Sequence, residues 1–124
     1  MEFSIVIPVF ILMILGIMEF GRGFMVIHLL TDAARKGCRS AAVLGSSTAT
    51  ITSTINDILT SGSIPGSATT ITVKVNTVIA DASSAKSGDR IQVIVSVPAS
   101  QVNFVSALSY LTGNLSGQYT MNRE

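Results

Sequence analysis

The chain has 124 residues, of which 48% are hydrophobic and only 12% are charged, and its formal net charge is +1. This length allows one modest domain with an appendage. The small net charge provides no basic field that would attract a polyanion, so we expect no nucleic-acid partner. The single cysteine, Cys38, excludes an intrachain disulfide. We expect it to be a small residue through which a helix packs on its neighbours. The alternative is a disulfide bridge to another chain or a reactive thiol.

The apolar residues are concentrated at the N-terminus. Nearly every residue from Phe3 to Leu30 is apolar, whereas the chain after Gly45 is rich in Ser, Thr and Gly with scattered Val and Ile. We therefore predict two parts. Residues 1–45 form a hydrophobic helix for assembly or membrane crossing, and residues 46–124 form a small α+β head with a polar surface.

The hydrophobic helix contains an acidic and a basic residue within its apolar run. Residues 3–18 are uncharged and would extend roughly 24 Å as a helix, short of a hydrocarbon core of about 30 Å. Residues 3–30 would extend roughly 42 Å but include Glu19 and Arg22. These two lie on one helix face, where each can neutralise the other. They mark either a functional contact inside the apolar helix or an ion pair just outside a short span.

The first residues differ from those of a secretory signal. Such a signal begins with basic residues and ends at a small-x-small site, whereas this chain has Glu2 and no such site before the helix continues. We therefore expect the segment to remain in the mature protein. The Glu2 carboxylate is favoured by the positive end of the helix dipole. Pro8 removes one backbone hydrogen bond, to the Ser4 carbonyl, and allows a kink.

Small residues recur every four positions in the second half of the helix, at Ala33, Gly37, Ala41 and Gly45. Such a ridge lets another helix or a sheet approach closely. It packs either on the chain's own head or on neighbouring copies, and the pattern favours neither. We expect Gly45 to end the helix as a left-handed cap.

The head shows one helical pattern and two strand patterns. Apolar residues at helical spacing predict a helix over about 48–60, ending at Gly62. Alternation then predicts two antiparallel strands, with the inner positions Ile71, Val73, Val75, Ile79 and Ile91, Val93, Val95, Val97. Residues 102–111 suggest a short helix or turn, and the segment around Tyr119 and Met121 a third strand. The predicted fold class is α+β, a long helix whose C-terminal half packs on a small antiparallel sheet.

Residues that could carry catalysis are scarce. The only histidine, His28, lies in the apolar helix without a second zinc ligand, and no G-x-S-x-G motif is present. We expect the head's acids, Asp57, Asp81 and Asp89, to be solvated. The sequence therefore predicts no enzyme, no metal and no cofactor. Asn114 begins an N-glycosylation acceptor pattern, Asn-Leu-Ser.

The N-terminal motifs resemble a known family. The pairs and single residues that carry the likeness are Glu2-Phe3, Pro8, Gly16 and Glu19-Phe20-Gly21-Arg22, followed by Ala33-Ala34-Arg35-Lys36-Gly37. This arrangement is similar to the start of TadE-like pilins, of the tight-adherence (type IVc) branch of type IV pili. The likeness is specific over roughly the first 45 residues and extends less specifically through the paired strands.

The resemblance implies a pilin-like protein that is inserted in the inner membrane before assembly and is matured by a prepilin peptidase. It also implies the pilus assembly machinery as a partner and a helical filament of identical copies at the cell surface. The residues expected in subunit assembly are Glu2, Phe3, Pro8, Glu19 and Arg22. In one departure, family precursors carry their glutamate several residues beyond the cleavage site, whereas only Met1 precedes Glu2 here.

Three functions stay open at this point. The first is a structural pilin that polymerises through its N-terminal helix. The second is a minor pseudopilin that helps to assemble such a filament. The third, from another class, is a single-pass membrane-anchored binding module outside the cytoplasm.

Overall fold

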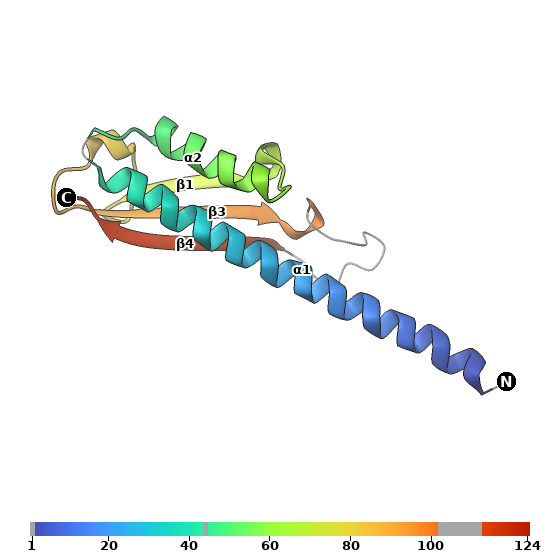
Figure 1. Ribbon diagram of the computed structural model, residues 1–124. Helices are drawn as coiled ribbons and strands as arrows, with labels where there is room; N and C mark the ends of the chain where they lie inside the picture. The colour runs from blue at the N-terminus through green and yellow to red at the C-terminus, as the bar shows by residue number, and fades with distance from the viewer. Residues whose placement is uncertain (1, 44, 102–112) are drawn as a thin grey trace.

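The computed structural model describes residues 2–43, 45–101 and 113–124. Its first element, α1, is one continuous helix over Phe3–Ala42 that contains Pro8. Figure 1 shows that the N-terminal half of α1 extends away from the molecule, while its C-terminal half lies along the head. The expected cap at Gly45 is wrong, because α1 ends at Ala42 with Val43 in an extended conformation. Gly45 has a φ of +88° but lies beyond the helix.

The second helix, α2, spans Thr48–Ser61, close to the predicted range. The Ser47 hydroxyl caps its N-terminus by accepting the Thr50 N–H at 3.4 Å. Its buried side chains are Ile51, Ile55 and Leu59, which recur at helical spacing. At the other end, the N–H of Gly62 donates to the Ile58 carbonyl at 3.2 Å and to the Leu59 carbonyl at 3.1 Å.

Four strands form one antiparallel sheet among the described residues. They are β1 (Thr70–Val75), β2 (Val78–Ile79), β3 (Arg90–Pro98) and β4 (Asn114–Asn122), in the order β2-β1-β3-β4. Short 3-10 helices, η1 (Gly66–Ala68), η2 (Ala82–Ser84) and η3 (Ala99–Gln101), lie in the connections. The α+β class and the strand around Tyr119 are therefore confirmed. The short helix or turn expected over 102–111 lies outside the described residues.

A tight turn makes one sequence prediction wrong. We expected Ile79 on the inner face with Val75, but Asn76 and Thr77 have φ values of +50° and +72°. Positive φ at both central residues is the geometry that reverses a chain in a two-residue hairpin. Val75 therefore pairs with Val78. As a result Ile79 lies in the edge strand β2 and is 73% exposed.

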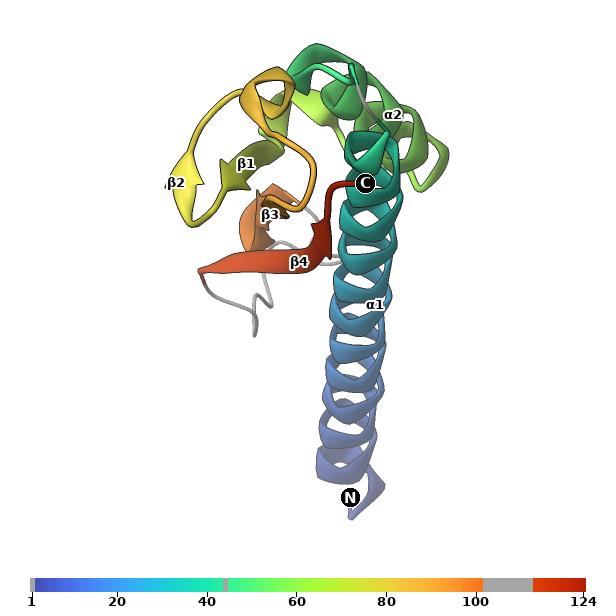
Figure 2. The same ribbon diagram turned by 90° about the vertical axis from the view of Figure 1, so that its left-hand side faces the viewer.

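Both helices cover the same face of the sheet. α1 packs mainly on β4 and β3, and α2 packs beside it on α1 (Figure 2). The core between them consists of Leu30 and small residues of α1, the inner isoleucines and leucine of α2, and the inward side chains of β3. The second half of α1 is thus part of the head, while its first half is free of it.

Candidate assembly surface

The N-terminal half of α1 exposes apolar side chains around its whole circumference. Phe3 is 77% exposed and Ile17 is 62% exposed, and the large residues between them are exposed as well, except Leu15, which is half-buried. We call the segment Phe3–Met18 the arm. The helix is long and apolar enough to cross a membrane, with a mean hydropathy of 2.5 in its most apolar window. Only 6% of that window is buried, unlike the core helix of a soluble protein.

The structure divides the five expected assembly residues into two groups. Glu2 and Phe3 lie at the exposed tip, with Glu2 at the N-cap of α1, and Pro8 lies within the exposed arm. By contrast, Glu19 is only 2% exposed and Arg22 is half-buried. Glu19 is also the first buried position of α1. It therefore marks the point at which the arm ends and the helix becomes part of the head.

The ridge of small residues lies against the chain's own head. Ala33 and Ala41 are fully buried. Gly37 faces α2 so closely that a Cβ atom there would lie 2.8 Å from Cδ1 of Ile55. Gly45, outside the helix, has no atom of the described chain within 4 Å of such a Cβ. Of the two alternatives for the ridge, packing on the head accounts for its three helical members, and the arm remains as the open surface.

Two further residues attach α1 to the sheet, and sequence patterns did not single out the first of them. Gly117 of β4 approaches the α1 backbone so closely that a Cβ atom would lie 2.3 Å from the Thr31 nitrogen. A glycine inside an alternating strand is the available signal for such an approach. Two turns further along α1, the Cys38 thiol donates to the Tyr119 carbonyl at 3.1 Å. Cys38 is completely buried, in agreement with its expected packing role.

The other missed residue is Arg123, next to the last residue of the sequence. It is 3% exposed, and its guanidinium donates to the Ala82 carbonyl and, at 3.4 Å, to the Val43 carbonyl. Its backbone N–H donates to the Asp89 carbonyl at 2.8 Å. A cation at this place satisfies a carbonyl just beyond the C-terminus of α1 and is favoured by the helix dipole. Arg123 thereby joins the end of α1, η2 and the loop before β3.

The remaining sequence candidates lie on the surface. His28 is exposed on α1, and Asn114 is exposed at the start of β4. Ser116, the third position of the acceptor pattern, is exposed as well. The side chains of Asn114 and Ser116 are therefore accessible to a modifying enzyme, and glycosylation of Asn114 stays a prediction.

A family model supports the resemblance in the part of the chain that contains the arm. Residues 1–39 match the model described as TadE-like protein. The N-terminal segment is TadE-like. Neither the curated proteins nor the solved structures that we compared with the chain give a match. The TadE-like segment comprises the arm, Glu19, Arg22 and two residues of the small-residue ridge, Ala33 and Gly37. The match thus covers the part of α1 that is long and apolar enough to cross a membrane.

Proposed function

We propose that this chain is a structural pilin that polymerises through its arm into a helical filament at the cell surface. One observation carries the proposal. The small residues of α1 are used within the head, while the apolar arm is exposed on all sides. An arm of this kind requires either lipid or other apolar helices around it. A protein of the tight-adherence pilus has both, lipid before assembly and neighbouring arms afterwards.

The energetics favour polymerisation once the arm leaves lipid. Apolar surface removed from water contributes about 25 cal/mol per Å². The arm is apolar around its circumference, so each helix can contact several neighbours at once. A head-to-tail contact between identical copies that does not close into a ring generates a helical polymer. Heads then lie outside and arms inside.

Glu2 has a defined place in this arrangement. Its carboxylate lies at the N-terminal end of α1, where the helix dipole favours a negative charge. In a stack of arms, it would also lie close to the N-terminal amine of an adjacent copy. An ion pair between copies at this depth would be screened little by solvent, and would set the register between neighbouring arms.

Imaging of sheared surface material and mass spectrometry of its main protein test the proposal. A structural pilin is the dominant component of the filaments. If the chain is present only in trace amounts in filaments that another protein forms, it is a minor pseudopilin instead. The binding-module alternative predicts that a chain without residues 1–30 retains binding of a ligand and that no filament depends on the protein.

A further inference from the structure

The sheet has an uncovered edge along the first part of β1. β2 pairs only with Lys74 and Val75, which leaves Thr70–Val73 without a strand partner on that side among the described residues. Asn76 donates its N–H to the Arg90 carbonyl, so every second residue before it directs its backbone groups toward β3. Ile71 and Val73 therefore direct their N–H and C=O groups outward, to the uncovered edge.

A hollow of about 400 Å³ lies beside this edge, lined by Ile71, Val73, Ile79 and Asp81 among others. Next to it, Val78 is 65% exposed and Ile79 is 73% exposed. Natural edge strands are commonly protected by charges, proline or a bulge. The segment Thr70–Val73 has no charged residue and no proline. Unpaired backbone groups beside a pocket for side chains are the two features used in strand addition.

The opposite edge of the same sheet is formed by β4, which α1 contacts. Every second residue of β4 pairs with a residue of β3 that directs its backbone groups toward β4. These residues of β4 are Leu115, Gly117, Tyr119 and Met121. The intervening residues of β4 therefore direct theirs outward, and the side chains concerned are exposed and uncharged: Ser116, Gln118 and Thr120. None of these residues has a strand partner on that side in the described part of the chain.

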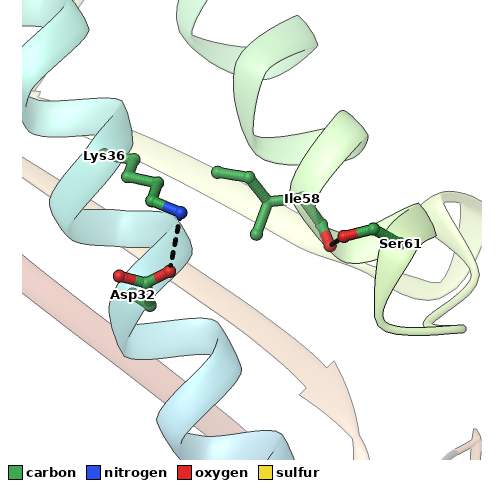
Figure 3. Close-up of polar contacts among 4 residues, drawn as sticks. All are labelled: Asp32, Lys36, Ile58 and Ser61. Atoms are coloured by element: carbon green, nitrogen blue, oxygen red, sulfur yellow. Dashed lines mark hydrogen bonds and ion pairs between the residues drawn. The ribbon is translucent and has the colours of Figure 1, made fainter.

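Charged side chains lie near both edges. The Arg35 guanidinium lies 5.8 Å from the centre of the Tyr119 ring, on the side of α1 that overhangs β4. Arg39 is exposed one turn further along the same helix face. Asp32 and Lys36 lie beside these arginines on the exposed face of α1, and Figure 3 shows that they pair with each other, at 3.1 Å. Two arginines thus lie near the β4 edge, while Asp81 lies beside the unpaired part of β1 and Lys74 lies in the part that β2 pairs with.

Strand direction determines how a second copy would fit. β1 and β4 are each antiparallel to β3, and therefore run parallel to each other. A copy displaced sideways without rotation brings its β1 against β4 as a parallel strand. In parallel pairs, a residue bonds to the two neighbours of the residue opposite it. Ile71 opposite Tyr119 therefore bonds to Gln118 and Thr120, and all inner side chains stay on the helix-covered face.

We infer that β4 of one copy pairs with the uncovered edge of β1 of the next copy, so that the sheets of neighbouring heads continue into one another. Arg35 and Arg39 of one copy then face Asp81 of the next. The contact joins different surfaces and does not close, as a filament requires. The inference rests on the proposed function in that it takes all copies to lie in one orientation. Because β2 already pairs with Lys74 and Val75, β4 of the neighbouring copy can pair only with the residues of β1 before Lys74. This favours the register in which Thr72 lies opposite Thr120.

Disulfide cross-linking of the full chain in cells tests this pairing. The variant Thr72→Cys/Thr120→Cys should give a ladder of dimers, trimers and higher species on mild oxidation. Thr72→Cys/Gln118→Cys tests the pairing shifted by two residues, which keeps the same faces together. Each single variant should give no ladder. A matched control, Thr72→Cys/Ser53→Cys, places the second thiol on the exposed side of α2.

The outcomes separate this inference from the proposed function. Normal filaments without a ladder from either edge pair overturn the inference and leave the proposed function intact. A ladder of equal yield from the control, or dimers from Thr72→Cys alone, also overturns it. If the wild-type chain forms no filaments, the proposed function fails, and a ladder in its membranes would still support the pairing of edges.

A charge reversal provides an independent measurement. Asp81→Arg should reduce the cross-linking of the edge pair, because the reversed charge faces Arg35 and Arg39. Asp81 also accepts the Ser83 N–H at 2.9 Å, so this variant alone could act by loosening η2. Adding Arg35→Asp and Arg39→Asp should restore the ladder, which a loosened η2 could not do. If the combined variant does not restore the ladder, Asp81 of one copy does not face Arg35 and Arg39 of the next.

Discussion

Gly117 of β4 lies directly against the backbone of Thr31 in α1. A Cβ atom on Gly117 would come within 2.3 Å of the Thr31 nitrogen and 2.4 Å of the Leu30 carbonyl carbon. Backbone atoms inside a helix cannot move aside as the end of a flexible side chain can. The distance between helix and sheet at the centre of the head is therefore set by the absence of a side chain at this one position.

Gly117→Ala should destabilise the head by about 1–3 kcal/mol, the usual cost of forcing extra atoms into a packed contact. Urea unfolding of the detergent-solubilised chain, followed by circular dichroism, measures the change. Gly21→Ala is the matched control, because a Cβ atom at Gly21 meets nothing within 4 Å in the described chain. An alanine at position 117 that leaves the unfolding midpoint unchanged would show that the helix and sheet separate easily.

Gly37→Ala should cost less than Gly117→Ala, although both glycines lie at close contacts. The first atom that a Cβ on Gly37 would meet is Cδ1 of Ile55, at 2.8 Å, and it is the end of a flexible side chain. A change of rotamer can remove that overlap, whereas the contact at Thr31 involves backbone. The same unfolding measurement ranks the two variants, and the reverse order would contradict this explanation.

The sequence predicted the helices and strands whose apolar residues recur with a clear period. It failed where the conformation or the contacts of a single residue determine the structure. The long helix, α2, the inner positions of β3 and the strand at Tyr119 follow from spacing. The turn at Asn76-Thr77 was missed because it lacks the glycine that normally marks such a hairpin. The spacing predicted a ridge of small residues over Ala33–Gly45, and its members within α1 pack on the chain's own head; that partner depends on the whole topology and is not visible in the spacing.

Arg123 was missed for a related reason. A charged residue beside the end of a chain is normally solvated, and no pattern in the sequence shows that β4 returns to the end of α1. The candidate assembly residues were found through the family resemblance and the charge pattern of the helix. Periodicity did not reveal that Glu19 is buried while Glu2 is exposed, since both interrupt the same apolar run.

Arg123→Ala should destabilise the head by about 2–3 kcal/mol, since it removes charge-assisted hydrogen bonds from the buried carbonyl of Ala82 and the partly buried carbonyl of Val43. The Ala82 and Val43 carbonyls lose their donor, and the end of α1 loses its attachment to η2. Amide hydrogen exchange near Ala42 should become faster, and the urea midpoint should fall. Glu124→Ala is the control, because Glu124 is exposed and contacts Ala42 through its backbone only. Equal effects of the two variants would contradict the role given to Arg123.

Asp89 should make the stability of the head depend on pH in the acidic range. Its carboxylate accepts the Lys86 N–H at 2.8 Å and the Asn76 side-chain amide at 3.0 Å. These hydrogen bonds, that of Lys86 first, lower the pKa of Asp89 from the ordinary value of 3.8. Because the pKa is lower in the folded state, the contribution is complete above the unfolded pKa and is lost as pH falls through the folded value.

The measurement for Asp89 is the difference in unfolding free energy between the wild type and Asp89→Asn as a function of pH. The difference should be constant near neutral pH and should shrink as pH falls below about 4, where the unfolded carboxyl binds its proton. Asp57→Asn removes a charge from the exposed side of α2 and serves as the control. A difference that stays constant down to pH 2 would mean that the carboxylate form contributes nothing.

Glu2→Ala should block entry of the chain into filaments while leaving its membrane insertion and its head intact. Glu2 is exposed at the tip of α1, far along the helix from the first buried residue, Glu19. A change at Glu2 therefore removes no contact within the head, and only neighbouring copies would experience the loss of its charge. Glu2→Gln keeps the shape and removes the charge, so it should have nearly the same effect if the ion pair between copies is what matters. The measurement compares the amount of chain in sheared filaments with the amount in the membrane fraction. If both variants form filaments of normal number and length, Glu2 does not take part in assembly. The assembly surface then consists of the apolar side chains of the arm alone.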